Sequence, residues 1–384
     1  MIRSFDKPRN ALPATVLAFL LGCAAAAQAS STSDVDELAL LQILRAEHVA
    51  QANTGFVFLM AHDGEIVLAD HAGLAVVEHQ LPMERDARFP TMSITKAFIG
   101  TALAVAADRG QVDLDEPIAT YLPGYPGDGA DRITLRMLAA HTSGIPHTRH
   151  PDRRPLYAQH FEDARSSIGV YASRPLVFEP GTDYAYSSSG YNLIAAILET
   201  VNDLPIQRIV GRDVLQPLGL TDTAHGNVER PFARLVRNYS YIDLWSYQPV
   251  EALLQVPTWD FSYNHGGGNM VSSADDLLAF GQALLDETSW SEELRQRWTS
   301  RAAPDVSRWS LGWILGEDSA GRRTVSITGA TPGVQAALYV YPDHDLVFVA
   351  LANCWGRDSA DADLVIGAPQ RIVDAYLTEA GSAP

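Results

Sequence analysis

Short apolar runs gather near the two ends of the chain and predict β-strands there. Near the N-terminus, residues 55–61 and 65–70 are mostly apolar, and His62-Asp63-Gly64 between them is a hairpin turn signal. Residues 74–78 predict a third strand. Towards the C-terminus the runs have the spacing of an antiparallel meander, at residues 309–315, 323–328, 334–341 and 345–353.

The middle of the chain, from about 111 to 300, reads mainly as helix and loop. Helical spacing of apolar residues is seen at 35–51, 133–144, 187–201, 273–285 and 368–380, and an apolar helix is expected to end at Gly110. These patterns predict an α+β fold, in which one antiparallel sheet is made from both chain ends and flanked by the terminal helices. The sheet part would cover about 35–88 and 305–384, and a helical subdomain, about 93–300, would be inserted between them.

Composition supports a globular body and excludes some partners. Hydrophobic residues make up 47% and charged residues 19% of the 384 positions, which is enough for a sizeable core. The formal net charge of −18 disfavours nucleic acid and anionic membrane surfaces as partners. The two cysteines are Cys23 and Cys354. We expect Cys354 to be a small buried apolar residue.

The first 29 residues resemble a secretory signal peptide, so we expect an exported protein, periplasmic or secreted. A basic segment is followed by the apolar run ALPATVLAFLLG and by Ala27-Gln28-Ala29, which has small residues at the positions that a signal peptidase reads. The run is too short to span a bilayer. The alternative is a lipid anchor, because Leu20 to Cys23 is similar to a bacterial lipobox. The remaining domain would be 30–384.

One pair of residues suggests chemistry. Ser93 and Lys96 are three positions apart at the start of an apolar helix, and lysine occurs in the whole chain only at positions 7 and 96. Arginine cannot lose its proton near neutral pH, whereas a buried lysine can. A desolvated lysine beside a hydroxyl could take the serine's proton and activate it as a nucleophile. By itself this four-residue pattern is weak, because serine and lysine often meet at this spacing.

Longer segments give the pair a context. FPTMSITKAFIGTALAVAADRGQVDLDEPIATYLPG resembles the serine β-lactamase and penicillin-binding-protein superfamily. The similarity is greatest to the branch of class C β-lactamases, D-amino-acid peptidases and family VIII carboxylesterases. ITLRMLAAHTSGIP, FEPGTDYAYSSSGYNLIAAILE and GGGNMVSSADDLLAF resemble further blocks of that branch, in the same order. The resemblance covers essentially all of the chain after the signal segment.

This resemblance implies a serine hydrolase that works through an acyl-enzyme and needs no metal or cofactor. Ser93 would be the acylated nucleophile, Lys96 its base, and Tyr186 a third catalytic residue that relays the proton to the leaving group. Tyr184 is the fallback if the register differs by two. The backbone N–H groups of Ser93 and Ala330 would form the oxyanion hole.

The chain departs from the family pattern at two positions. Ser188 replaces the usual asparagine, and Ile327 occupies the place of the lysine or histidine that binds a substrate carboxylate. Because isoleucine cannot pair with a buried carboxylate, we expect neutral esters or amides to be preferred over carboxylate-bearing β-lactams. The substrate-binding residues predicted here are Ser188, Thr328, Gly329 and Asn269.

Other readings of the sequence stay open. A D-amino-acid peptidase or β-lactamase-type amidase is the alternative enzyme, and a non-catalytic penicillin-binding-like protein is the alternative from another class. The spacing of His141, His147, His150 and His160 fits no standard zinc pattern. His141 is expected to hold its turn by a hydrogen bond. Aromatic residues that either line an acyl pocket or pack under a loop are Trp245, Tyr247, Trp259, Phe261 and Tyr263.

Overall fold

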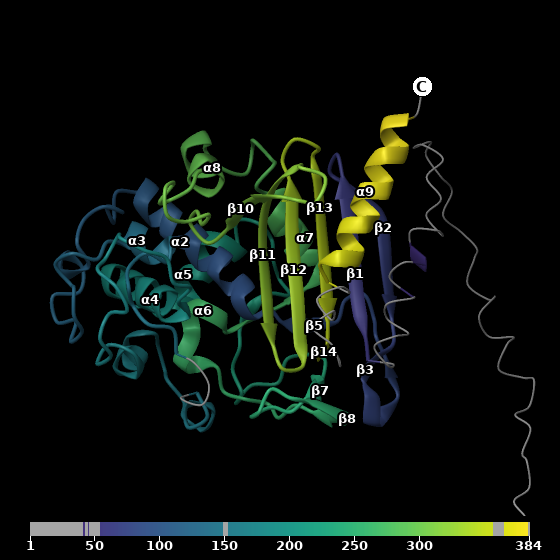
Figure 1. Cartoon of the computed structure of the whole chain (residues 1–384), viewed down its shortest axis with the longest axis horizontal. Helices are drawn as coiled ribbons and strands as arrows, with labels where there is room; N and C mark the ends of the chain where they lie inside the picture. Colours follow the sequence, from purple (N-terminus) through teal and green to yellow (C-terminus); the bar gives the residue numbers. More distant parts are fainter. Residues whose placement is uncertain (1–40, 43–44, 46–53, 149–152, 356–364, 383–384) are drawn as a thin grey trace, which may run out of the picture.

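The computed structural model describes residues 41–42, 45, 54–148, 153–355 and 365–382. The expected signal segment, Cys23, His150 and most of the helix expected over 35–51 lie outside these residues. A six-stranded antiparallel sheet in the order β10-β11-β12-β13-β1-β2 dominates the fold (Figure 1). Its strands are β1 (Phe56–His62), β2 (Glu65–Ala72), β10 (Ile314–Glu317), β11 (Arg323–Thr331), β12 (Val334–Tyr341) and β13 (Leu346–Ala352).

Strands from the two ends of the chain meet in the middle of this sheet. β1 pairs with β13 from Phe56↔Ala352 to His62↔Leu346, and it pairs with β2 through the predicted hairpin. The hairpin turn is made by Asp63 and Gly64, both with positive φ, at 50° and 80°. Two consecutive left-handed residues match the right-handed twist of the flanking strands. The predicted α+β fold, with a sheet from both chain ends, is confirmed.

Helices cover both faces of the sheet. On one face, α9 (Gly367–Ser382) packs Ile372 and Val373 against Phe58 and Phe348 of the sheet. On the other face lie α7 (Ala274–Gln282) and the apolar helix α2 (Thr95–Asp108), which belong to the larger core. Figure 1 shows α9 in front of the strands and α7 behind them. The sheet is therefore buried on both faces, which explains why its strands read as continuous apolar runs.

The helical part lies beside the β10 edge of the sheet (Figure 1). Four of its helices begin at a serine or threonine whose side chain accepts a hydrogen bond from a backbone N–H of the first turn, a common way to satisfy helix ends: Thr134 for α3, Ser187 for α4, Ser273 for α7 and Ser291 for α8. The remaining bounds are α3 (Leu135–Ala139), α4 (Ser188–Asn202), α5 (Ile206–Val210), α6 (His265–Gly268) and α8 (Glu292–Thr299).

Several short strands lie outside the main sheet. They are β3 (Leu74–Val76) with β4 (Leu81–Pro82); β5 (Arg88–Pro90) and β6 (Ala224–His225) on either side of β9 (Met270–Ser273); and β7 (Tyr239–Ile242) between β8 (Pro249–Gln255) and β14 (Cys354–Trp355). Only the 74–78 segment was expected as a strand, and it pairs outside the main sheet. Most of these strands are too short to show a period, and β8 is largely exposed and carries few buried apolar positions. Cys354, at the start of β14, is buried as expected.

The strand predicted at 309–315 is mostly irregular, so this prediction was wrong. Regular pairing begins only at Ile314, while Leu311 and Trp313 are buried in the core as loop residues. Gly312 explains the difference. It has φ +94°, and a Cβ added to it would lie 2.4 Å from the carbonyl oxygen of Lys96. The loop is therefore held tightly against α2 at the turn that carries Lys96.

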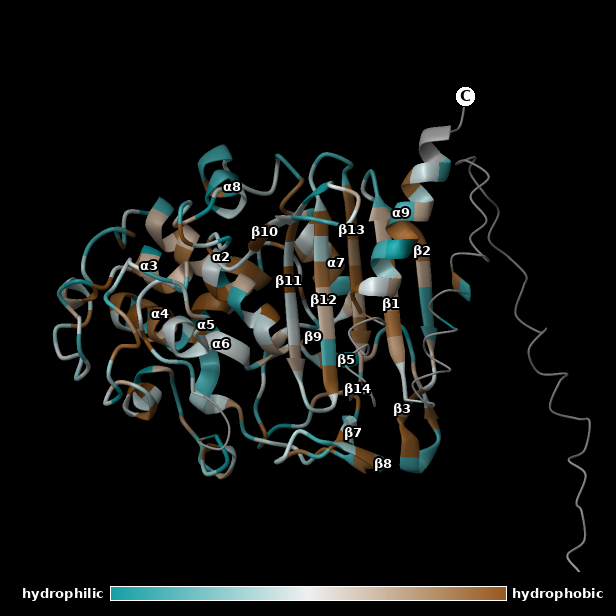
Figure 2. Ribbon diagram, viewed as in Figure 1, coloured by the Kyte–Doolittle hydropathy of each residue, from teal (hydrophilic) through white to brown (hydrophobic). Residues whose placement is uncertain are grey.

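Residue hydropathy differs between the elements of the core and α8. Figure 2 shows mostly apolar colours on the strands of the main sheet and on α2, whereas α8 is mostly hydrophilic. Among the residues that the structure describes, no helix has the length and apolar character needed to cross a membrane.

Candidate active site

Ser93 lies in a tight turn between β5 and α2, rather than inside the helix itself. The turn is the 3₁₀ helix η2 (Met92–Ile94), and α2 begins two residues after Ser93. The turn is fixed to β9, because Thr91 N–H donates to the Met270 carbonyl at 2.8 Å. Met92 has a positive φ of 47°, a strained backbone for a side chain of this size. Strain of this kind, held by its surroundings, presents the Ser93 hydroxyl in one orientation.

Lys96 is completely buried beside this serine. Its Nζ lies 3.2 Å from Ser93 Oγ, 3.0 Å from Ser188 Oγ and 2.6 Å from the Gly267 carbonyl oxygen. A neutral amine has two N–H donors and one lone pair. If the two donors go to Ser188 and Gly267, the lone pair is left for the hydroxyl proton of Ser93. This arrangement can activate the serine.

Tyr186 completes the group from the loop before α4. Its hydroxyl is 2.6 Å from Ser93 Oγ, and its ring lies 4.8 Å from Lys96 Nζ. The alternative, Tyr184, is 41% exposed and accepts a hydrogen bond from Trp309 Nε1, so it does not reach Ser93. The structure thus brings Ser93, Lys96 and Tyr186 together, in the register favoured by the sequence.

His141 supports the loop that carries Tyr186. The ring is buried, and its Nδ1 accepts a hydrogen bond from Ser187 N–H at 3.1 Å, while its backbone carbonyl accepts from Ala185 N–H. The ring also packs against Tyr186 at 4.6 Å between centroids. This agrees with the expectation that His141 holds its turn by a hydrogen bond. Burial, together with the nearby Lys96, lowers the pKa of His141 well below its ordinary value, so the ring is neutral.

The electrostatics of Lys96 and Tyr186 suit proton transfer. Burial lowers the pKa of Lys96, and the positive charge of Arg153 adds to this, although Tyr186 works in the opposite direction. Burial works to raise the pKa of Tyr186, but the charge of Lys96 and hydrogen bonds from Lys96, Ser93 and Ser188 outweigh it, so the net pKa is lowered. The pKa values of the amine and the phenol are therefore both below their ordinary values, closer to neutral pH.

β11 approaches the Ser93 turn very closely at Gly329. A Cβ at this position would lie 2.1 Å from the Thr91 carbonyl oxygen and 2.9 Å from the backbone nitrogen of Ser93. Only glycine allows the strand to come this near. The next residue, Ala330, is exposed and lines the same cavity as Ser93. Ser93 and Ala330 thus lie on the two sides of the opening where an oxyanion would be bound.

The other predicted binding residues differ in position. Ser188 lines the Ser93 cavity, whereas Thr328 and Gly329 lie on β11 beside it without lining it. Asn269, predicted as a polar contact in the active-site wall, lines a neighbouring cavity. Its amide Nδ2 donates to the Gly226 carbonyl at 3.2 Å, which turns it away from Ser93. Ile327 is buried in the main core.

The cavity at Ser93 is small, about 120 Å³, and contains residues that the sequence did not indicate. Arg153 is one of them. Its Nε donates to the Thr148 carbonyl at 2.6 Å, and its Nη2 lies 2.5 Å from His147 Nε2. His147 Nδ1 in turn accepts from Ser188 N–H at 3.1 Å. The Ser93 cavity therefore contains a cation, although Ile327 occupies the place of the usual one. The cation comes from a segment whose Pro-, Arg- and His-rich sequence has no period.

A second and larger cavity of about 650 Å³ adjoins the first. Both cavities are lined by Met92, Phe261, Gly268 and Thr331. Of the aromatic residues noted in the sequence, Trp259 and Phe261 line the larger cavity, and Phe261 and Tyr263 line the smaller one. Trp245 packs against Trp259 from outside, at 5.8 Å between ring centroids. Tyr247 packs against Trp355.

His160 and His265 contact other groups of the protein. His160 Nδ1 lies 2.8 Å from Asp260 Oδ2, and His265 Nε2 lies 2.9 Å from the Phe161 carbonyl oxygen. No group of three or more potential metal ligands is found in the part of the chain that the structure describes.

Comparisons with known proteins show which family the chain resembles. The Beta-lactamase family model matches residues 41–368. The chain is 24% identical over 314 residues to penicillin-binding protein 4* of Bacillus subtilis (strain 168), a match covering 77% of this chain and 67% of that protein. It is 28% identical over 292 residues to esterase EstB of Burkholderia gladioli, covering 68% of this chain and 74% of that protein.

Solved structures show the same fold. The D-amino acid amidase from Ochrobactrum anthropi SV3 superposes with a TM-score of 0.76 at 23% identity, covering 89% of this chain and 98% of that one. Several other sequence relatives are longer, and this chain spans about half of their length.

Proposed function

The chain belongs to the beta-lactamase family and is a serine hydrolase, and from this premise we propose that it cleaves esters or amides through an acyl-enzyme on Ser93. The observation that carries the proposal is the contact set of the buried Lys96. With Ser188 and Gly267 as acceptors for its two N–H groups, its lone pair is directed at the Ser93 hydroxyl, 3.2 Å away. Proximity and a lowered pKa are the two requirements for a general base.

In this mechanism, Ser93 Oγ attacks the substrate carbonyl carbon while its proton passes to Lys96. The negative charge that develops on the carbonyl oxygen is stabilised by the backbone N–H groups of Ser93 and Ala330. Tyr186, 2.6 Å from Ser93 Oγ, then gives its hydroxyl proton to the leaving group as the bond between that group and the carbonyl carbon breaks, and Lys96 passes the proton taken from Ser93 to Tyr186. Attack by water on the acyl-enzyme, with the same groups removing its proton, releases the acid and restores Ser93.

The substrate class we propose is the neutral ester or amide. Ile327 stands where the family carries a carboxylate-binding cation, and it is buried among apolar side chains. A panel of p-nitrophenyl acetate, p-nitrophenyl butyrate, nitrocefin and a D-amino-acid p-nitroanilide tests this on the purified protein. We expect ester turnover to exceed nitrocefin turnover; efficient nitrocefin hydrolysis without esterase activity would contradict the proposal.

Arg153 favours a second candidate function, the hydrolysis of carboxylate-bearing substrates such as D-amino-acid peptides. Its guanidinium lines the Ser93 cavity and retains N–H groups beyond those that face Thr148 and His147. Guanidinium groups bind carboxylates well. If this function holds, Arg153→Gln will lower kcat/KM for nitrocefin and for peptides ending in D-alanine, and leave p-nitrophenyl acetate unchanged at a pH above the acid limb of the rate profile.

A non-catalytic binding role remains the alternative from a different class, and a fluorophosphonate probe separates it from the enzyme. The probe forms a covalent bond only with an activated serine. We expect labelling of the wild-type protein and none of Ser93→Ala. An unlabelled wild-type protein, or labelling that survives in Ser93→Ala, would remove Ser93 as the nucleophile.

Export is also part of the proposal. It is supported by the basic and apolar segments within residues 1–29 and by the small residues before Ser30. Expression of the full chain in a Gram-negative host, followed by N-terminal sequencing, tests it. A mature protein beginning at Ser30 in the periplasm or medium is expected, whereas acylation that is lost in Cys23→Ala would show the lipid-anchored alternative. An uncleaved N-terminus in the cytoplasm would contradict both.

A further inference from the structure

We propose that the larger cavity is the acyl pocket of this enzyme, and that it selects substrates with a bulky, uncharged, apolar acyl group. This inference rests on the proposed function, because it assigns the two halves of an ester or amide to the two adjoining cavities. The leaving group would occupy the small cavity beside Tyr186, and the acyl group would enter the larger one.

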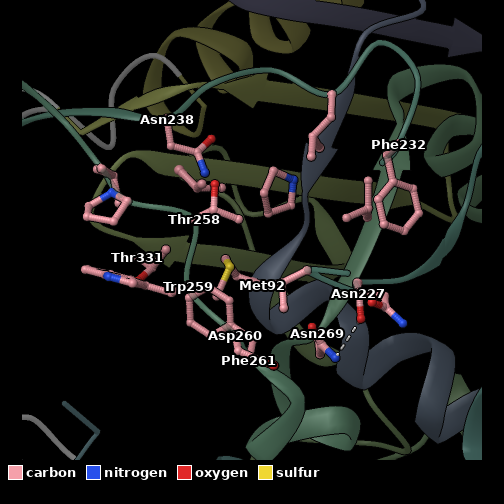
Figure 3. Close-up of a pocket in the computed structure, with 18 of the residues that line it drawn as sticks. Met92, Asn227, Phe232, Asn238, Thr258, Trp259, Asp260, Phe261, Asn269 and Thr331 are labelled. Atoms are coloured by element: carbon pink, nitrogen blue, oxygen red, sulfur yellow. Dashed lines mark hydrogen bonds between the residues drawn. The ribbon is translucent and has the colours of Figure 1, made fainter. Parts of the chain in front are cut away.

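The two cavities are adjacent and share part of their walls next to Ser93. Met92, the residue before the nucleophile, lines both, as do Gly268 of α6, Phe261 and Thr331 at the end of β11. The larger cavity is therefore the neighbouring space for a group attached to the carbonyl carbon at Ser93. Figure 3 shows Met92, Phe261 and Thr331 near one another at the wall of this cavity.

The position of Tyr186 decides which half of the substrate takes this path. Tyr186 lies against Ser93 Oγ and, together with Arg153 and Ser188, lines the small cavity but not the large one. The leaving group must lie beside the residue that protonates it. With the carbonyl oxygen directed at Ser93 and Ala330, the remaining substituent, the acyl chain, is directed towards the residues that the two cavities share.

The walls of the larger cavity are aromatic and held in place. The Trp259 ring stacks on Tyr157, with 4.4 Å between centroids and an angle of 4° between planes. Phe261 meets Trp259 edge-on at 6.3 Å, and Phe232 lies on another side of the cavity in Figure 3. The volume of about 650 Å³ is in the range of sites that hold small organic ligands. An acetyl group would leave most of this space unfilled.

The charged residues of the lining indicate an uncharged occupant. Four charged residues line the larger cavity: Glu229, Arg230, Arg237 and Asp260. Asp260 is paired with His160, and Arg237 is paired with Glu78 at 2.5 Å. Glu229 and Arg230 are of opposite charge and adjacent in the chain, so the lining has no net charge. An ionised acyl group would therefore gain little in return for its lost hydration.

Two series of p-nitrophenyl and simple alkyl esters test the assignment. The first varies the acyl group, from acetate through butyrate and octanoate to phenylacetate, with p-nitrophenol as the constant leaving group. The second keeps acetate and varies the alcohol from ethyl to benzyl. We expect kcat/KM to rise by at least about tenfold from acetate to the largest well-fitting acyl group, since each added methylene in an apolar pocket improves transition-state binding.

Thr258→Trp narrows the larger cavity without touching the small one. Thr258 is exposed and lines only the larger cavity, so the variant should fold. We expect it to abolish the gain for large acyl groups and to leave acetate esters of every alcohol unchanged. Val177→Trp is the matched control, because Val177 is 56% exposed and lines neither cavity. It should retain the wild-type profile.

The outcomes separate this inference from the proposed function. Fluorophosphonate labelling of Ser93 in each variant reports whether the nucleophile is active. If labelling is intact but Thr258→Trp changes the alcohol series instead, the two halves of the substrate are assigned the wrong way round. If Thr258→Trp changes kcat/KM in neither the acyl series nor the alcohol series, the larger cavity does not bind substrate. If wild-type labelling itself fails, the proposed function falls before the pocket is tested.

Discussion

The two adjoining cavities at Ser93 are built in opposite ways. The smaller, of about 120 Å³, is surrounded by hydrogen-bonded polar groups from η2, α2, α4 and α6, and the buried Lys96 has three oxygen atoms within 3.2 Å. The larger, of about 650 Å³, is walled mainly by loops around residues 226–238 and 255–261 and by aromatic rings. The difference suggests that the chemistry is fixed by rigid elements, whereas substrate choice is left to loops.

Ser93→Ala should have the largest effect, because it removes the nucleophile and leaves both cavities in place. We expect kcat/KM for p-nitrophenyl butyrate to fall by at least about 10³-fold. Ser272→Ala is the matched control. Ser272 is completely buried on β9, bonds to Thr223 and lines neither cavity, so this variant should keep its activity. Equal losses in the two variants would mean that the effect is on folding.

Lys96→Met tests whether the small cavity depends on a group that accepts a proton. The apolar side chain fills a similar volume but has no lone pair, so we expect a loss of about 10²–10⁴-fold in kcat. Lys96→Arg keeps the positive charge and the hydrogen-bond donors, but it cannot deprotonate. Lys96→Met and Lys96→Arg should both be inactive, and the two variants should differ from each other in stability. Substantial activity in Lys96→Arg would show that Lys96 contributes only charge.

Gly329→Ala tests the contact between β11 and the nucleophile turn. The added Cβ would lie 2.1 Å from the Thr91 carbonyl oxygen, so the strand must move away from Ser93. Separation of the two oxyanion donors should reduce kcat by about 10²–10³-fold. Gly124→Ala is the control, because a Cβ at Gly124 meets no atom within 4 Å. The melting temperature of each variant distinguishes a catalytic loss from unfolding.

The sequence predicted the smaller cavity better than the larger one, and the reason is physical. Ser93 and Lys96 are three positions apart at the start of α2, so their spacing along the chain determines their spacing in the structure. Tyr186 is 93 positions from Ser93 and was identified through the family resemblance of the block that carries it. The central sheet could also be predicted, because its strands are buried on both faces and read as apolar runs.

The residues that the sequence did not reveal come from segments without a period. Arg153 follows a loop rich in proline, arginine and histidine, and its place in the Ser93 cavity depends on contacts with Thr148 and His147. Asn269 was predicted to contact substrate, but nothing in the Gly-rich segment before it says which of the two cavities its side chain lines. Loop conformation is set by tertiary contacts that a single sequence does not display.

Trp259→Ala tests whether the larger cavity selects the acyl group. Loss of the ring that stacks on Tyr157 should lower kcat/KM for octanoate or phenylacetate esters by about tenfold, and leave the acetate ester nearly unchanged. Trp259→Phe keeps an aromatic wall and should retain most of the preference. Comparison of kcat/KM for large and small acyl groups within each variant cancels any common loss of active enzyme. A uniform loss for all esters would contradict a role in acyl selection.

Arg153→Gln should produce the smallest change, a displacement of the pH profile. The positive charge of Arg153 contributes to lowering the pKa of Lys96, so its removal raises that pKa. Lys96 then stays protonated, and unable to act as a base, up to a higher pH. The acid limb of kcat/KM for p-nitrophenyl acetate should therefore move to higher pH, while the plateau above it is retained.

Arg154→Gln is the control, because the Arg154 guanidinium lies over the Trp245 ring at 4.5 Å and not in the Ser93 cavity. A limb that moves to lower pH, or that moves equally in both variants, would show that Arg153 does not set the charge state of Lys96.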